Sequence, residues 1–456
     1  PAPPSPAVAQ ALRSAGIDTR VTPAAANLHV RLGALHPATH TYEVTMKPAT
    51  QQVDADTMQK SYLGATAQGE LIFDARTAPA VANLKPGTVT VFAGTALLKV
   101  TGVIRRGDFI AVSGVPAGLE DAIDHGRIGW TTTLDYTKVA FQPPPGFHRV
   151  RFLAGLIRPA NAEDSAGGNS FEGDIKGFKV ILQLTPARDN LHVDLHATRN
   201  ISGGIVEVHA VGQINGLTNE TLITLANGTT TQVTFDNNGL SGSVDFDWNV
   251  GFDAQHGGDD KELLKSAVEN LPFSFEVPLD VGPIPFLVTI KAGFSFQAAF
   301  SSKATVASGS YHASFGGNVP NTVGAGGGDG AAVVSGDGQI KTHGGTVSLA
   351  PVGLTTIAAL PKVSLTLGLP ENLLSFMKTP ELGGPYATFM VRADFIATGA
   401  MSVAQCERRV LYVMVFAGYE PGVLGLLFKD PAKKLFERRV TQVTPSNITL
   451  CQDKSS

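Results

Sequence analysis

Hydrophobic and polar residues alternate with a period of two along much of the chain. In the segment GFKVILQL (177–184), Phe178, Val180 and the two leucines share one side. In GSVDFDWNVGF (242–252), large apolar residues alternate with Ser, Asp, Asp and Asn. Successive side chains of a strand point to opposite faces, so this period predicts β-strands with one buried face and one solvated face.

Short turn segments separate the alternating segments. The Asn227-Gly228 pair lies between ETLITLA and TTTQVTF, and Asn-Gly is a strong hairpin signal. Many strands joined by short turns predict a mainly β fold, either an antiparallel β-sandwich or a large curved meander sheet. Few short helices are expected: a brief one in AGLEDAIDHG that Gly126 ends, and one in KELLKSAVENL (261–271).

Composition divides the chain into parts. Residues 1–26 are rich in Pro and Ala and predict an N-terminal tether, and the FQPPPGF segment (141–147) predicts a stiff domain boundary. We therefore expect a small β-rich domain, a β-barrel or β-roll, at 27–141 and a large antiparallel β domain at 148–456. Within the large domain, the glycine-rich residues 317–345 predict an exposed mobile loop.

The segment 273–300 contains the densest alternation of phenylalanine and aliphatic residues. It predicts two strands, Phe273–Leu279 and Phe286–Phe300, joined by a proline-stiffened turn. Burial of each phenylalanine contributes about 2 kcal/mol, which favours a role in the core. The alternative is a groove for an apolar ligand or lipid, lined by Phe294, Phe296, Ala298 and Phe300.

Charged residues are few for a protein of 456 residues. They make up 16% of the chain, against a usual fraction of about 25%, while there are 50 glycines and 28 prolines. This composition favours a loop-rich extracellular β protein. The 35 basic and 39 acidic residues give a net charge of −4, which argues against a nucleic-acid partner.

The first residues and the apolar runs bear on the location of the protein. The start PAPPSPAVAQ predicts a mature N-terminus left by a cleaved signal peptide, hence a secreted, extracellular or cell-surface protein. The longest apolar run, VLYVMVFAGY (410–419), is shorter than the ~20 residues of a membrane-spanning helix, so no transmembrane segment is expected. Outside the cell, the two cysteines, Cys406 and Cys451, predict one disulfide that closes the C-terminal segment.

One predicted hairpin gathers residues with metal-ligand chemistry. In HVDLH, His192, Asp194 and His196 are spaced by two and share one face of a strand. The next strand, IVEVHAV, places Glu207 and His209 together. Imidazole and carboxylate groups suit Zn²⁺ or another divalent metal, and they also serve as acids and bases. The alternative is the solvated polar face of a half-buried sheet, and strand register decides between the two.

Two aspartates in the glycine-rich segment predict a calcium site. Asp329 in GGGDG and Asp337 in SGDGQ offer carboxylates beside flexible turns, a combination that Ca²⁺ accepts. An unligated loop is the alternative. Apart from such a divalent metal, we expect no cofactor.

The familiar catalytic motifs are missing from the sequence, which contains no GxSxG, HExxH or GxxxxGK[ST] pattern. We expect a non-catalytic secreted or cell-surface β-rich protein, a structural, assembly or adhesion component that associates with itself or with other surface proteins. Two alternatives stay open. One is an extracellular binding protein for an apolar ligand or lipid, and the other is a secreted metal-dependent hydrolase that uses the His192–His209 hairpin.

Overall fold

The computed structural model has the mainly β architecture that the alternation predicts, with few and short helices. The structure describes residues 10, 28–31, 37, 39–66, 69–138, 147–149, 169–175, 177–201, 204–252, 269–299, 305–324, 332–341, 347–348, 352–367, 384–400, 403–419 and 433–443.

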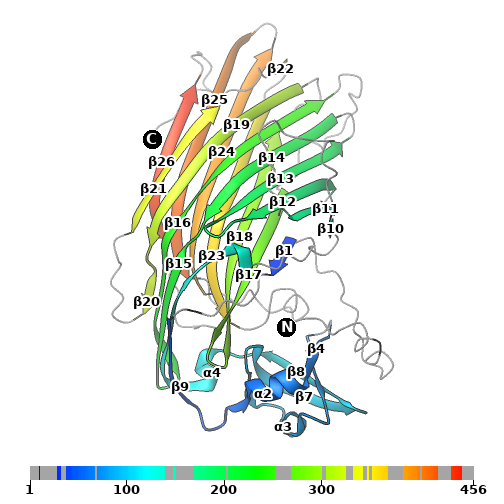
Figure 1. Ribbon diagram of the computed structural model, residues 1–456. Coiled ribbons are helices and arrows are strands. Elements are labelled where there is room, and N and C mark those ends of the chain that lie inside the picture. Colours follow the sequence, from blue (N-terminus) through cyan, green and yellow to red (C-terminus); the bar gives the residue numbers. More distant parts are fainter. Residues whose placement is uncertain are drawn as a thin grey trace.

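Two large sheets form the body of the molecule (Figure 1). The first has seven strands, which are in sheet order β1 (Leu28–Arg31), β17 (Glu269–Val281), β18 (Ile284–Ala299), β23 (Val352–Leu367), β24 (Pro385–Ala400), β25 (Val403–Tyr419) and β26 (Lys433–Val443). Neighbouring strands are antiparallel except β1 and β17, which are parallel.

The second sheet has thirteen strands, and its centre is a strand of 24 residues, β16 (Thr229–Phe252). The others are β2 (Thr39–Met46), β9 (Ile123–Thr133), β10 (Phe147–Arg149), β11 (Asn169–Ile175), β12 (Phe178–Pro186), β13 (Asn190–Ile201), β14 (Gly204–Asn215), β15 (Thr218–Ala226), β19 (Thr305–Val319), β20 (Thr322–Gly324), β21 (Val333–Lys341) and β22 (Val347–Ser348). At about 3.3 Å per residue, β16 is roughly 80 Å long. One half of β16 pairs with β15 and β20, and the other half pairs with β14 and β19, so β16 joins two groups of strands into one sheet.

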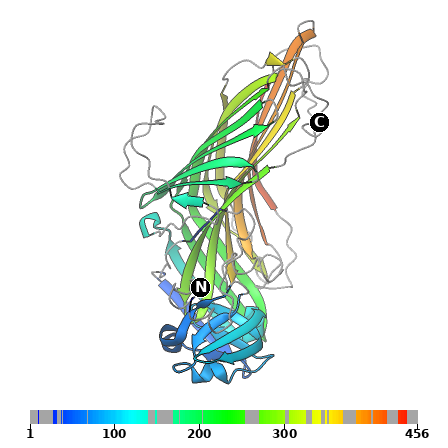
Figure 2. The same cartoon turned by 90° about the vertical axis from the view of Figure 1, so that its right-hand side faces the viewer.

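A six-stranded sheet forms a small domain at one end of the large sheets (Figure 2). Its strands are β3 (Gln51–Val53), β6 (Val89–Phe92), β7 (Ala96–Arg106), β8 (Phe109–Pro116), β5 (Leu71–Asp74) and β4 (Tyr62–Ala65). The helices described in full are α2 (Ala55–Ser61), α3 (Pro79–Ala82), α4 (Leu119–Ala122) and the 3-10 turn Tyr136–Lys138.

The small domain is inserted between β2 and β9, which pair with each other in the thirteen-stranded sheet. This arrangement differs from the small domain expected at 27–141, because three strands of that range, β1, β2 and β9, belong to the large sheets. The physical reason is the core that these strands face: Trp130 on β9, only 3% exposed, packs among the apolar side chains between the large sheets.

The small domain packs against the turn between β17 and β18. The amide of Gly94 donates to the carbonyl of Pro283 at 3.1 Å. Beside it, Gly282 has a φ of +62°, and a Cβ at this position would lie 2.6 Å from the ring of Tyr42 on β2. Val91 of the small domain also belongs to the core of the large sheets. The apolar core therefore continues from the large sheets into the small domain.

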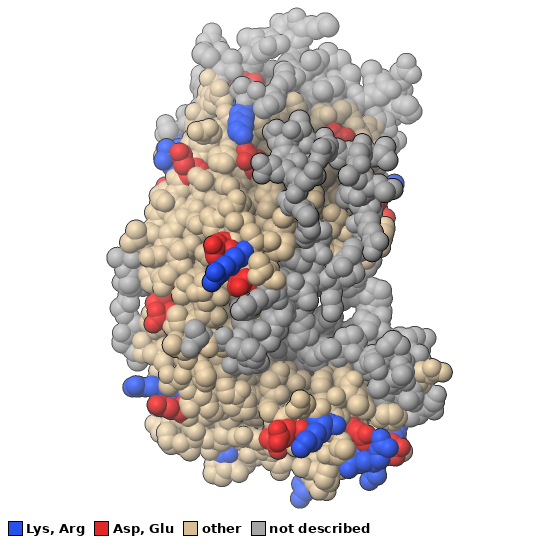
Figure 3. All heavy atoms as spheres, viewed as in Figure 1, with Lys and Arg blue, Asp and Glu red and all other residues tan. Residues whose placement is uncertain are grey.

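Charged side chains are sparse on the face of the molecule that Figure 3 shows. They lie in small groups that mix both signs, and uncharged surface separates these groups. This distribution agrees with the charged fraction of 16%. Among the described residues, no helix combines the length and the apolar character needed to cross a membrane.

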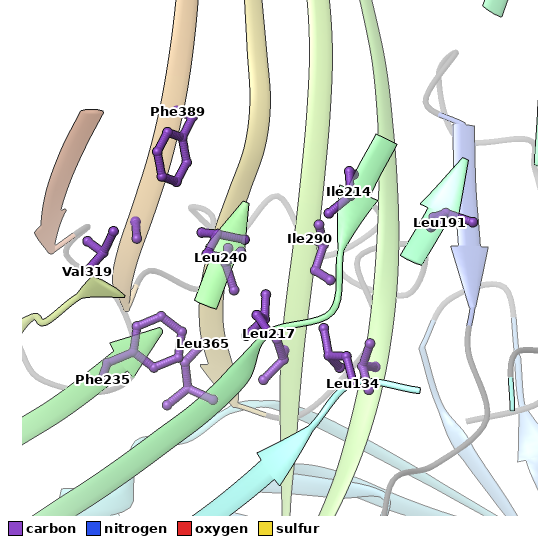
Figure 4. Close-up of a cluster of buried hydrophobic side chains, with 14 of the residues drawn as sticks. Leu134, Leu191, Ile214, Leu217, Phe235, Leu240, Ile290, Val319, Leu365 and Phe389 are labelled. Atoms are coloured by element: carbon purple, nitrogen blue, oxygen red, sulfur yellow. The ribbon is translucent and has the colours of Figure 1, made fainter. Parts of the chain in front are cut away.

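Apolar side chains fill the space between the two large sheets. Figure 4 shows Phe235 of one sheet and Leu365 and Phe389 of the other within one buried cluster. Trp130 on β9 packs against Phe286 on β18, with ring centroids 4.7 Å apart. At about 25 cal/mol per Å² of apolar surface removed from water, this shared core is the main stabilising contribution.

Two predicted hairpins are present. The hairpin expected at 273–300 is formed by β17 and β18, with Gly282 and Pro283 as its turn. The Asn-Gly hairpin is formed by β15 and β16, and Asn227 has a φ of +52° as such a turn requires. The helix expected in AGLEDAIDHG is limited to α4, because β9 begins at Ile123.

The glycine-rich segment 317–345 differs from the mobile loop that its composition predicts. It contains the end of β19, all of β20, and β21, which pairs with β19. A Cβ at Gly338 of β21 would lie 2.5 Å from the side chain of Leu411, and one at Gly336 would lie 2.8 Å from that of Val413. Glycine is needed at these two positions because β21 packs closely on β25 of the other sheet, so small size rather than flexibility explains Gly336 and Gly338.

Two other expectations fall outside the residues that the structure describes. They are nearly all of the tether at 1–26 and most of the helix at 261–271. The last residues of that predicted helix, from Glu269, belong to β17.

Asn321 links the two large sheets through buried hydrogen bonds. Its side-chain amide donates to the carbonyl of Tyr386 on β24 at 3.2 Å and to that of Gly418 on β25 at 2.9 Å. Its backbone amide donates to the carboxylate of Asp236 on β16 at 3.1 Å. Buried carbonyls need hydrogen-bond donors, so one side chain satisfies groups on two strands of the opposite sheet.

Gly126 permits the close approach of β2 to β9. Its φ is +147°, and a Cβ there would lie 2.2 Å from the carbonyl oxygen of Glu43. We expect Gly126→Ala to lower the free energy of unfolding by about 2–4 kcal/mol, because the methyl group overlaps the backbone of β2. Denaturant titration measures this loss. The control is Gly102→Ala on β7, where a Cβ meets no atom within 4 Å; equal losses in the two variants would contradict the steric explanation.

We expect Asn321→Ala to lower the free energy of unfolding by about 1–3 kcal/mol, because two buried carbonyls lose their donor. The same titration measures this effect. Asn249→Ala serves as the matched control, since the Asn249 side chain is exposed and makes a single long hydrogen bond of 3.5 Å to Glu207. If both substitutions had the same small effect, the proposed link between the sheets would be wrong.

Candidate functional site

The hairpin of β13 and β14 carries the five residues that the sequence predicts as metal ligands. The strand register places His196 directly opposite His209. Asp194, His192 and Glu207 lie opposite residues that are not metal ligands in the prediction. All five point away from the core, because the apolar residues that alternate with them are buried between the sheets.

The contact between His209 and Asp194 is the best-defined one of this hairpin. Nε2 of His209 lies 3.0 Å from Oδ1 of Asp194, and the side chains are 35% and 24% exposed. The hydrogen bond to Asp194 raises the pKa of His209 above its usual value; burial opposes this rise, and the charges of Asp194 and Asp247 add to it. The ring of His196 stands edge-on to that of His209, with centroids 5.9 Å apart.

A second histidine–aspartate pair lies on the same outward face. Nδ1 of His312 on β19 is 3.0 Å from Oδ1 of Asp245 on β16. Nζ of Lys341 on β21 donates to the same oxygen at 2.7 Å. Burial acts to raise the pKa of Asp245, but the hydrogen bonds from Lys341 and His312 outweigh it, so the pKa is lowered.

This second pair is not evident from the sequence. The alternation in GSVDFDWNVGF places Asp245 on the polar side of its strand, and the alternation in SYHASF (310–315) would place His312 on a polar side too. Nothing in either segment says that β16 and β19 are neighbours. Only the pairing of β16 with β19, two strands that are distant in sequence, brings Asp245 and His312 together. A period-two pattern does not indicate which strands pair.

The five predicted ligands do not converge on one point. His192 lies opposite Gln213 of β14, which is six positions along that strand from Glu207. Roughly 20 Å therefore separates His192 from Glu207. In the part of the chain that the structure describes, no group of three or more His, Cys, Asp or Glu side chains is placed to hold a metal ion. The physical reason is that residues on one face of one strand are spread along its length. Only His209, Asp194 and His196 are near neighbours.

One of the two predicted calcium ligands lies within the described residues. Asp337 belongs to β21, pairs with Arg438 of β26 at 3.1 Å and accepts a hydrogen bond from the amide of Gly338 at 2.8 Å. The flexible turn that motivated the calcium prediction is thus a strand at this position, and a guanidinium already neutralises the carboxylate. Asp329 lies outside the described residues.

The residues predicted for an apolar groove and for a disulfide are described only in part. Phe294 and Phe296 belong to β18, but their side chains lie outside the described set, and so does the whole of Phe300. Cys406 belongs to β25 with a side chain that is not described, and Cys451 lies outside the described residues. Both predictions therefore stay predictions.

Hydrogen-bonded pairs lie on the face shared by β13, β14, β16 and β19. Two of its imidazoles, His209 and His312, each share a hydrogen bond with a carboxylate. All four side chains of these pairs are partly exposed on the outside of a sheet. A face of this kind excludes little water, and this favours binding or a response to pH over chemistry that needs an enclosed site.

The bond between His209 and Asp194 predicts a pH-dependent contribution to stability. Because the pKa of His209 is higher in the folded state, the contribution is complete below about pH 6.5 and is lost as pH rises through the folded pKa. We expect His209→Gln to lower the free energy of unfolding by less than about 1 kcal/mol in acid, and by less still in alkaline buffer. Urea titrations across this range measure it. His40→Gln, on the exposed part of β2, is the control. If the loss of unfolding free energy caused by His209→Gln did not vary with pH, protonation of His209 would not contribute to stability.

Comparisons with known proteins add no relative to this picture. No family model matches the chain, and no curated protein or solved structure matches it either. The function is therefore inferred from the residues and the geometry of the chain itself.

Proposed function

We propose that the chain is a non-catalytic, secreted or cell-surface β-rich protein that acts as a structural or assembly component. The observation that carries this proposal is the continuous apolar core, which joins both large sheets and the inserted domain. Close-packed interiors transmit strain and resist deformation. A body of long strands around one core is suited to bearing load and to holding surfaces at fixed positions.

The outward surface supports contacts between copies. Few charged side chains lie on the face in Figure 3, and groups of both signs are mixed there. A low density of charge weakens the repulsion that keeps copies of a protein apart. Contacts over this uncharged area therefore require little neutralisation of charge.

The edge strand β2 favours self-association. Among the described strands, β2 pairs only with β9, so its other side offers backbone donors and acceptors. Its outward residues Thr41, Glu43 and Thr45 are exposed. Glu43 is the one carboxylate of the strand, which contains neither Pro nor Lys, the residues that often protect strand edges. A second chain can add a strand here by backbone hydrogen bonds alone.

Two alternatives from the sequence remain proposals of lower support. A binding protein for an apolar ligand depends on Phe294, Phe296 and Phe300, and a metal-dependent hydrolase depends on the His209–Asp194 pair. Secretion through a cleaved signal peptide and a Cys406–Cys451 disulfide belong to the main proposal, because an extracellular location accounts for both.

Sedimentation velocity of the full chain tests the main proposal. We expect self-association that grows with protein concentration, and weaker association for Thr41→Lys, because a charged side chain on an edge strand opposes strand addition. Thr101→Lys on β7 is the matched control, since Thr101 is equally exposed but lies within a strand pair of the small domain. A chain that stays monomeric at every concentration would exclude an assembly role, and equal weakening by both substitutions would exclude β2 as the contact.

A further inference from the structure

We propose that the outward face of β24, β25 and β26 docks on the surface of an anionic phospholipid bilayer. We term this surface the basic face; its cations are Lys362 of the neighbouring strand β23, Arg392, Arg408, Lys434 and Arg439. It belongs to the seven-stranded sheet, whereas the histidine–aspartate pairs lie on the thirteen-stranded sheet. The proposal does not depend on self-association through β2.

The direction of these side chains follows from strand alternation. Val391, Leu411 and Val413 are at most 1% exposed and belong to the core. The residues that alternate with them point to the other side of the sheet. Arg392 lies opposite Tyr412, which in turn lies opposite Arg439, so one row of the outward face contains two cations around an aromatic ring.

The basic face is positive in a chain whose net charge is −4. Its five cations stand against two carboxylates on the same side, Asp394 and Glu437, which leaves a net charge of +3. The side chains of Arg392 and Lys434 are 47% and 51% exposed. Clustered basic residues are attracted to the negative surface of an anionic leaflet.

Aromatic and apolar side chains lie between the cations. Tyr412, Met414 and Phe416 alternate along β25, and Met390 of β24 lies opposite Met414. All four are partly exposed. Aromatic rings with a polar end and long basic side chains are the residue types that suit the headgroup region of a bilayer. A solely electrostatic surface would not need these side chains.

Stacking on Tyr412 holds two guanidinium groups in place. The Cζ atoms of Arg392 and Arg439 lie 5.9 Å and 5.8 Å from the centroid of the Tyr412 ring. Nζ of Lys362 lies 4.4 Å from the centroid of Tyr386 in the same way. The Nε and Nη2 groups of Arg392 also bond the carboxylate of Asp394, each at 3.0 Å. A guanidinium stacked on a ring keeps further N–H groups at its rim, and such groups form hydrogen bonds with phosphate.

Protection of a sheet edge is the competing explanation, because charged residues on edge strands prevent aggregation. It explains Lys434 and Arg439 on the edge strand β26. It does not explain Lys362, Arg392 and Arg408, since β23, β24 and β25 each have a neighbouring strand on both sides. A basic surface that extends across interior strands favours a partner.

Three central strands of the opposite sheet carry acidic residues on their outward side. The outward side of β13, β14 and β16 holds Asp194, Glu207, Asp245 and Asp247, and none of the described outward side chains of these strands is Lys or Arg. An anionic bilayer attracts the basic face and repels this one. The molecule would therefore lie on the membrane in one orientation, with the histidine–aspartate pairs toward the solvent.

Vesicle flotation of the full chain tests the proposal. We expect binding to vesicles of equal parts phosphatidylcholine and phosphatidylglycerol, none to phosphatidylcholine alone, and release as salt shortens the range of electrostatic attraction. Arg392→Gln/Arg439→Gln should lower the partition coefficient roughly thirty-fold, as expected for two basic residues near an anionic surface. Arg105→Gln/Arg106→Gln, on the exposed end of β7, removes the same charge and should bind like the unmodified chain.

Thermal unfolding checks that both double variants are folded. If Arg392→Gln/Arg439→Gln does not fold, Lys362→Gln/Lys434→Gln replaces it, with the same expected loss of binding. Three results would overturn the proposal: no binding to anionic vesicles, equal losses in the basic-face and β7 variants, or binding to soluble dextran sulfate without binding to vesicles. Sedimentation velocity of the same variants shows whether they still self-associate, so a loss of vesicle binding can be distinguished from a loss of self-association.

Discussion

Removal of alternate side chains from water is the constraint on which the rest of the structure depends. Every long strand of the two large sheets places one row of residues in the same apolar layer. A slip of one residue in β16 would expose Phe246 and Trp248 and would bury Asp245 and Asp247. The core therefore fixes the register, and the register in turn brings His209 to Asp194 and His312 to Asp245 on the outside.

The two large sheets and the small domain form one body because they share this layer. Val91 of the small domain and Trp130 of β9 belong to the same cluster as Phe286 of the opposite sheet. The buried side-chain amide of Asn321 adds a polar link, because it donates to carbonyls near the ends of β24 and β25. Because the inward faces are buried in the core, we infer that partners bind to the outward surfaces, where the two sheets differ in charge.

The alternation in the sequence was sufficient to predict strands, their buried sides and local hairpins such as β17–β18. It was not sufficient for contacts between distant strands. Nothing near His312 indicates Asp245, and β2 and β9 have the same pattern as the strands of the domain inserted between them. The glycines of β21 predicted a flexible loop. In the structure, positions 336 and 338 need glycine because the side chains of Val413 and Leu411 leave no room for a Cβ atom. Contacts of this kind depend on how distant segments pack together, and the sequence of one segment does not indicate its distant neighbours.

The insertion between β2 and β9 has a consequence for the order of folding. These strands pair across a whole domain, and closure of so long a loop costs entropy that slows the pairing of distant strands. The small domain has its own core, around Phe73 and Phe92, and its pairs β6–β7 and β7–β8 are local in sequence. If it folds first, the hydrogen bonds from Lys47 and Thr50 to the carbonyl of Ala122 bring its two ends together. The inserted domain then converts a long loop closure into a short one and nucleates the thirteen-stranded sheet.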